Sequence, residues 1–105
     1  MDTQYREALK HLATVASAAV PDSWQELGTE ATFYPGNAVG SSCWHRDALD
    51  SPQIWVDVPT ELSKKISDSL RAVRDALMQS GNPTPSGLTF RVSRAGKASV
   101  DVRYA

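Results

Sequence analysis

The stretch LTFRVSRAGKASVDVRY, residues 88–104, decides the fold that we expect for this chain. Phe90 and Val92 alternate with polar residues before Gly96, and Val100 and Val102 do the same after it. Alternation with a period of two is typical of a strand with one buried face. A glycine between two such runs is typical of a hairpin loop. The sequence therefore predicts a C-terminal β-hairpin with one apolar face.

The length of the hairpin loop determines which residues face each other. A two-residue loop at Ala95 and Gly96 would place Val92 opposite Ser99 and so mix apolar with polar residues. A three-residue loop over 95–97 instead gives the pairs Val92 with Val100, Phe90 with Val102 and Arg91 with Asp101. We predict this second register, because it buries one face and pairs charges on the other.

Upstream of the hairpin, hydrophobic periodicity predicts two helices and three strands. One helix is expected over about residues 3–20, and a second runs from Thr60, its expected N-cap, to a terminating Gly81. The strands are expected at 24–34, 39–46 and 53–58, with a turn at 35–37 and a polar loop after residue 46. The predicted fold class is α+β: helix, three-stranded antiparallel unit, helix and C-terminal β-hairpin, with one sheet and both helices on one face. The chain, 1–105, suits a single domain.

Composition restricts the classes of function. A formal net charge of −1 argues against a protein built to bind nucleic acid, since such proteins carry a strong positive field. No apolar run is long enough to cross a bilayer, and the N-terminal residues do not read as a signal peptide. The expected compartment is the cytoplasm, with neither a membrane nor a nucleic acid as partner.

The most reactive-looking segment is GSSCWHRD, residues 40–47, which holds the only cysteine, Cys43, and His45. On a strand these two side chains would share a face, roughly 6.5–7 Å apart, which is long for a thiolate–imidazolium contact. A structural zinc site requires four ligands, and the chain has three cysteine or histidine residues in total. Catalysis by Cys43, a metal site, and an acid pair from Asp47 and Asp50 remain alternatives. The sequence favours a plain strand with a buried thiol, and predicts no catalytic, cofactor-binding or metal-binding residue.

The sheet face that the helices leave uncovered is the candidate binding surface. Alternation assigns to this face a set of aromatic and acidic residues: Glu30, Tyr34, Trp44, Trp55 and Asp57. Asp47 and Asp50 of the neighbouring loop extend the set. Aromatic residues are the usual anchors of protein interfaces, and acids would suit a basic cleft in a partner. The alternative is that Trp44 and Trp55 lie beneath a helix or loop, whereas Trp24 is expected in the core.

The hairpin also resembles the closing hairpin of the YezG-type immunity proteins. The matching residues are Leu88, Thr89, Phe90, Gly96, Lys97, Val100, Asp101 and Tyr104. PDSW at residues 21–24 is similar to the proline and tryptophan that lead into the first strand of that family. The resemblance covers the element order over nearly the whole chain, and specific residues match in the hairpin and at Trp24.

The resemblance implies a cytoplasmic antitoxin without enzymatic activity or a cofactor. Proteins of that family bind and block toxins, often nucleases, that bacterial secretion systems deliver. The expected partner is therefore a co-encoded toxin, bound one to one. The alternative from another class is a chaperone or adaptor for a secreted effector, which would bind an unfolded segment. A small enzyme that uses Cys43 is the third hypothesis.

Overall fold

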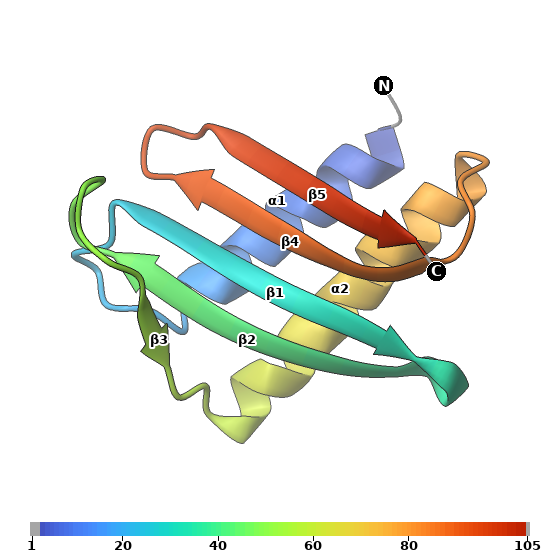
Figure 1. Ribbon diagram of the computed structural model, residues 1–105, viewed down its shortest axis with the longest axis horizontal. Coiled ribbons are helices and arrows are strands. Elements are labelled where there is room, and N and C mark those ends of the chain that lie inside the picture. Colours follow the sequence, from blue (N-terminus) through green and yellow to red (C-terminus); the bar gives the residue numbers. More distant parts are fainter. Residues whose placement is uncertain (1–2, 105) are drawn as a thin grey trace.

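The computed structural model describes residues 3–104, which form two α-helices and one five-stranded antiparallel sheet (Figure 1). The elements are α1 (Thr3–Ser17), β1 (Glu26–Tyr34), the 3-10 turn η1 (Pro35–Asn37), β2 (Ala38–Arg46), β3 (Ile54–Val56), α2 (Thr60–Gln79), β4 (Pro85–Ser93) and β5 (Ala98–Tyr104). The strand order is β3-β2-β1-β4-β5. The α+β class and the order of elements along the chain are confirmed. The hairpin does not stand beside a separate three-stranded unit, because β4 pairs with β1 and completes one sheet.

Strand β1 lies at the centre of the sheet, and its alternation separates the two faces. Leu27, Thr29 and Ala31 are buried, whereas Glu30 and Tyr34 are exposed. Figure 1 shows both helices behind the sheet, on the same side of it. Leu27 and Ala31 belong to the core cluster that the helices complete, so they and Thr29, which alternates with them, lie on the helix side.

The hydrophobic core fills the space between the sheet and the helices. Its helical members are Leu12, Val15 and Ala16 of α1 and Ile66, Leu70 and Val73 of α2. The sheet contributes Leu27, Ala31, Cys43, Leu88 and Phe90. Burial of large aliphatic and aromatic side chains stabilises the fold by about 1.5–3 kcal/mol each before chain entropy is counted. Trp24 packs against this cluster while remaining partly exposed.

The two ends of α2 differ in how well the sequence predicts them. Thr60 is the first helical residue and Pro59 takes the N-cap position, with no side-chain cap hydrogen bond, so the expected Thr60 cap is wrong. At the other end Gly81 has φ +95°, and the Asn82 N–H donates to the Leu77 carbonyl at 3.1 Å. This is a Schellman-type ending, which requires a left-handed residue and confirms the expected role of Gly81.

The C-terminal hairpin forms, but its register differs from the predicted one by two residues. Phe90 faces Val100, Arg91 faces Ser99, and Val92 faces Ala98. The predicted pairs of Val92 with Val100, Phe90 with Val102 and Arg91 with Asp101 are therefore wrong. The alternative register with a two-residue loop does not form either. A shift by two residues leaves every side chain on its expected face, because side chains alternate with the same period.

The hairpin turn explains the shift. Its loop is residues 94–96, in which the Gly96 N–H donates to the Ser93 carbonyl at 2.9 Å and Gly96 has φ +93°. A type I turn followed by a left-handed residue is the usual three-residue hairpin loop, and it places glycine last. The prediction placed Gly96 in the middle of the loop, where a positive φ is not needed.

Strand β3 is shorter than the predicted run of residues 53–58, since only Ile54, Trp55 and Val56 pair with β2. The segment available to it lies between Pro52 and Pro59, which favours a short edge strand. Helix α1 likewise ends at Ser17 rather than near residue 20. Tight turns follow that end of the helix, where the Ala19 N–H donates to the Ala16 carbonyl at 3.0 Å.

Candidate partner-binding surface

The sheet surface that faces away from the helices is called here the open face. It consists of every second residue of the paired strands, among them Glu26, Gly28, Glu30, Tyr34, Ser42, Trp44, Arg46, Trp55, Thr89, Arg91, Ser99, Asp101 and Arg103. The strand register places Glu30 between Ser42 of β2 and Thr89 of β4, and Trp55 beside Trp44. The open face therefore combines aromatic, acidic and basic side chains.

Four of the residues expected at a binding surface are exposed on or beside this face. Tyr34 is 54% exposed and Trp55 is 52% exposed, and Glu30 lies exposed at the centre of the sheet. Asp57 follows the end of β3 and is also exposed. These side chains are available to a partner.

Trp44 lies on the open face but is 1% exposed, so the expectation that it offers contact surface to a partner is corrected. It is paired with Gly28 of the neighbouring strand, and its indole lies across that glycine. A Cβ atom at Gly28 would lie 2.3 Å from the Trp44 ring carbons Cε2 and Cζ2. Arg46 covers the ring, with its Cζ atom 5.5 Å from the centroid. Trp44 is therefore packed against the sheet, and its indole fills a space that only a glycine at position 28 leaves free.

A group of charges beside Trp44 was not among the predicted site residues. The Glu26 carboxylate lies between two arginines, with Oε1 3.1 Å from Arg46 Nε and Oε2 3.8 Å from Arg91 Nε. Arg103 donates to the Ala31 carbonyl at 3.0 Å. Strand alternation would have placed these side chains on the open face beside Glu30. The open face therefore carries both signs of charge and not mainly acids.

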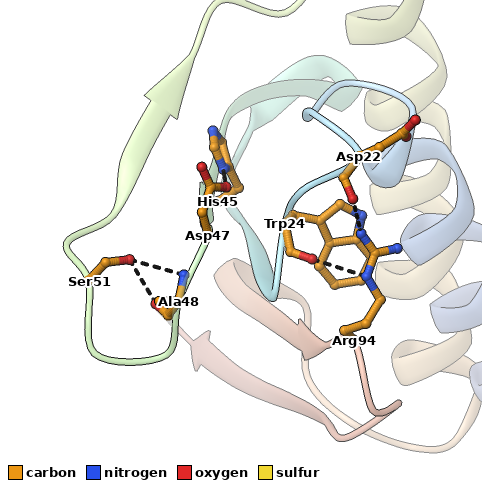
Figure 2. A network of polar contacts seen from close by, with 7 residues as sticks. All are labelled: Asp22, Trp24, His45, Asp47, Ala48, Ser51 and Arg94. Atoms are coloured by element: carbon orange, nitrogen blue, oxygen red, sulfur yellow. Dashed lines mark hydrogen bonds and ion pairs between the residues drawn. The ribbon is translucent and has the colours of Figure 1, made fainter.

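The loop after β2 is held by its own hydrogen bonds (Figure 2). Asp47 Oδ1 lies 2.8 Å from Nδ1 of the buried His45, so this carboxylate is already engaged within the chain. The Ser51 hydroxyl donates to the Ala48 carbonyl at 2.7 Å. Asp50 is exposed, and Leu49, which the sequence reasoning missed, is 69% exposed. The loop thus presents Asp50 and Leu49, but not Asp47, as free contact groups.

The side chains of Cys43 and His45 lie on the helix side of β2, away from the open face. Cys43 Sγ is 3.6 Å from the Thr29 hydroxyl oxygen. Burial raises the pKa of the Cys43 thiol, and the hydrogen bond with Thr29 offsets only part of that rise. A nucleophilic cysteine requires a lowered pKa and access to substrate, and Cys43 has neither. Within residues 3–104, no group of three or more histidine, cysteine or acidic residues is placed to hold a metal ion.

A second polar cluster joins the hairpin to the entry of β1 (Figure 2). The Arg94 guanidinium lies over the Trp24 ring, 4.0 Å from its centroid. Arg94 Nε donates to the Trp24 carbonyl at 3.0 Å, and Nη2 donates to the Asp22 carbonyl. Arg94 thus links the hairpin loop to the segment before β1. The contact between its guanidinium and the Trp24 ring gives Trp24 a structural role.

Comparison with known proteins leaves the family open. No family model matches the chain, and no curated protein matches it. Neither helix of the described chain is long and apolar enough to span a bilayer.

Proposed function

We propose that this protein is an immunity protein, which binds a co-encoded toxin one to one and blocks it through the open face. The observation that carries the proposal is Trp55, a half-exposed tryptophan on the sheet face that points away from the two described helices. Tryptophan is one of the residues most enriched among the hot spots of protein interfaces. The loop from 47 to 53 extends the same binding surface.

Exposed apolar side chains near one end of the sheet support a protein partner. Leu49 of the loop and Trp55 of the edge strand β3 are exposed within a short segment. Ile54 is exposed as well, but it pairs with His45 and so lies on the other face of the sheet. Exposed acids accompany them, namely Asp50 and Asp57. An apolar centre with a charged rim is the usual composition of a specific interface between proteins.

The resemblance to YezG-type proteins supports a toxin as the partner. It rests on the hairpin residues, among which Gly96 has a conformational role as the left-handed residue of the turn. The exposed acids Glu30, Asp50 and Asp57 suit a toxin with a basic cleft, such as a nuclease that acts in the cytoplasm. The arginines of the open face complement acidic groups around that cleft in the toxin.

One observation favours the alternative function, a chaperone or adaptor for a secreted effector. Among residues 3–104, strand β5 lies at an edge of the sheet with no further strand beside it, and such an edge can pair with an extended segment. A chaperone would bind an unfolded segment, whereas an immunity protein would bind a folded toxin domain. Binding measured with folded and urea-unfolded forms of the same partner separates the two functions.

The test is co-expression of the toxin domain from the adjacent gene with variants of this protein. Trp55→Ala and Asp57→Lys should reduce protection and weaken the complex in a pull-down, while Met78→Ala serves as the control. Met78 is a comparably exposed apolar residue on α2, away from the open face. Full protection by both open-face variants would exclude this face from the interface, and no binding to any neighbouring toxin would remove the immunity function itself.

A further inference from the structure

A pocket lies at the end of the open face where two loops meet. Figure 1 shows the loop between β4 and β5 and the loop between β2 and β3 at the same end of the sheet. The pocket has a volume of about 560 Å³, and Ala95 of the first loop lines it together with Leu49 of the second. This volume lies within the range of about 300–1,000 Å³ that is usual for small-molecule sites. The pocket is therefore large enough for a small organic ligand.

The charge of this pocket is opposite in sign to that of the whole chain. Its lining includes three basic residues, Arg91, Arg94 and Lys97, and one acidic residue, Glu26. These four give the pocket a net charge of +2, whereas the chain has a formal net charge of −1. The next acidic residue along β5, Asp101, is not part of the lining. A concave site lined by one sign of charge concentrates ions of the opposite sign, so this pocket favours an anion.

Two of the three basic side chains are available to that anion. Neither the Arg91 guanidinium nor the Lys97 ammonium donates a hydrogen bond to another residue of the described chain. Glu26 Oε2 lies 3.8 Å from Arg91 Nε, beyond hydrogen-bond distance, and Oε1 of the same carboxylate lies 3.1 Å from Arg46 Nε. Arg94, by contrast, already donates to two backbone carbonyls. Arg91 and Lys97 are therefore the groups that can bind a ligand directly.

The hairpin register brings these two cations together on the open face. Arg91 faces Ser99 across the two strands. Beside this pair, toward the loop, the Ser93 N–H donates to the Lys97 carbonyl at 2.9 Å, so these two residues also face each other. Diagonal neighbours in an antiparallel pair lie roughly 7–8 Å apart, a distance that long side chains can span. The Arg91 and Lys97 side chains can thus hold one anion between them, beside the hydroxyls of Ser93 and Ser99 that line the same pocket.

The number of charges to be matched distinguishes between common anions. A phosphate monoester carries a charge of about −1.5 to −2 at pH 7 and has three strong acceptor oxygens. It can therefore pair with both cations at once and accept a further hydrogen bond from Ser99. A carboxylate or a phosphate diester carries one negative charge and would leave one of the two cations unmatched. The pocket is therefore matched best by a phosphate monoester.

We propose that this pocket binds a small phosphate monoester, with its phosphate between Arg91 and Lys97 and its organic group against Leu49. Leu49 is 69% exposed and lines the same pocket, so it offers an apolar surface to that group. A nucleic acid fits poorly, because its backbone phosphates are diesters and the chain is acidic overall. The ligand is a small molecule and no toxin is required, so the test of this site is independent of the test of the proposed function.

The test uses phenyl phosphate as the probe, titrated into the full ¹⁵N-labelled chain. We expect saturable shifts of the amide signals of Arg91, Lys97 and Ser99. Methyl phenyl phosphate, which is a diester, and benzoate should bind about tenfold more weakly or worse, because each lacks one charge-assisted contact. The absence of saturable shifts, or equal affinity for the diester and the monoester, would overturn the proposal.

Inorganic phosphate tests whether the organic group contributes to binding. It should bind about fourfold more weakly than phenyl phosphate, the effect of burying roughly one methylene group against Leu49. Leu49→Ala should remove this difference, because it removes the apolar contact and leaves both cations in place. Equal affinity of the wild-type protein for inorganic phosphate and phenyl phosphate would contradict the proposed ester.

Substitution of the two cations locates the site. Arg91→Gln and Lys97→Gln should each weaken the binding of phenyl phosphate about tenfold, because each removes a charge-assisted hydrogen bond. Arg6→Gln is the matched control, since it removes the same charge from an exposed arginine of α1 that lines a different groove. This control should bind phenyl phosphate as the wild type does. An equal loss of affinity in Arg6→Gln and in the pocket variants would refute the site.

Ser99 provides a test that keeps both cations in place. Ser99→Asp puts a carboxylate directly opposite Arg91, where it competes with the phosphate, and should weaken binding about tenfold or more. Ser99→Asn has nearly the same size without the charge, so it should retain binding. Ser99 is exposed, and urea melts of both variants should match that of the wild type. Equal affinity of the two variants for phenyl phosphate would contradict a phosphate site at Arg91.

Discussion

Gly28→Ala is the substitution that tests the architecture of the open face most sharply. The new methyl group would lie 2.3 Å from two carbons of the Trp44 indole, a separation that no relaxed structure tolerates. Either the strands shift apart or the Trp44 ring moves out of its packed position beside residue 28. Overpacking of this kind costs about 1–3 kcal/mol when the surroundings adjust. Complete exposure of about 200 Å² of tryptophan surface, at about 25 cal/mol per Å², costs about 5 kcal/mol.

We therefore expect Gly28→Ala to lower the free energy of unfolding by about 3 kcal/mol, between these limits. With a urea m value of about 1.5 kcal/mol per M, the unfolding midpoint should fall by roughly 2 M. Circular dichroism of the backbone is the appropriate signal, because the fluorescence of Trp44 would itself change.

The control is the same substitution in a Trp44→Val background. The three atoms nearest to a Cβ at Gly28 all belong to the indole, so without it Gly28→Ala should cost little or stabilise slightly, since alanine loses less backbone entropy than glycine. The coupling energy between positions 28 and 44 should thus approach the full cost of Gly28→Ala in the wild-type protein. An equal loss of stability in both backgrounds would refute the argument that Trp44 requires Gly28.

Further predictions concern single side chains. Cys43→Ser should leave partner binding intact, and a large loss of binding would contradict this. In the wild-type protein, burial raises the pKa of the Cys43 thiol, so the free energy of unfolding should fall as pH rises from the ordinary thiol pKa to the raised pKa of the folded state. A pH series of urea melts that is flat in this range would contradict that expectation. Arg94→Ala should lower the unfolding free energy by about 1–2 kcal/mol and Arg94→Lys by less, because the contact over Trp24 and two carbonyl hydrogen bonds are lost; equal melts for wild type and Arg94→Ala would disprove this role. Gly96→Ala should cost about 1 kcal/mol, because a left-handed residue is required there, and an unchanged melting temperature would argue against the observed turn.

Periodicity was sufficient to predict much of this fold. Alternation assigned Glu30 and Tyr34 of β1 to the uncovered face, and both side chains are exposed there. Glycine signals worked where a positive φ was required, as at Gly81. They failed in the hairpin, because a shift of the strand pairing by two residues leaves every side chain on the same face of the sheet. Only the turn geometry, with its positive φ at Gly96, fixes the register.

The candidate site was predicted less completely, for a reason that Trp44 makes clear. Alternation indicates the face on which a side chain lies, and Trp44 does lie on the open face. It does not indicate exposure, which here depends on Gly28 in a neighbouring strand. The ion group of Glu26, Arg46 and Arg91 likewise joins three strands, so its members come together only once the strand order is known.

The measurement that tests the central claim most directly is the affinity of the purified protein for the toxin domain encoded beside it. Titration calorimetry should give one-to-one binding, weakened roughly 30-fold or more by Trp55→Ala, which corresponds to about 2 kcal/mol for a true anchor. Met78→Ala, with a comparably exposed apolar residue on α2, should bind as the wild type does. Wild-type affinity for Trp55→Ala, or equal loss in both variants, would contradict the claim that the open face binds the toxin.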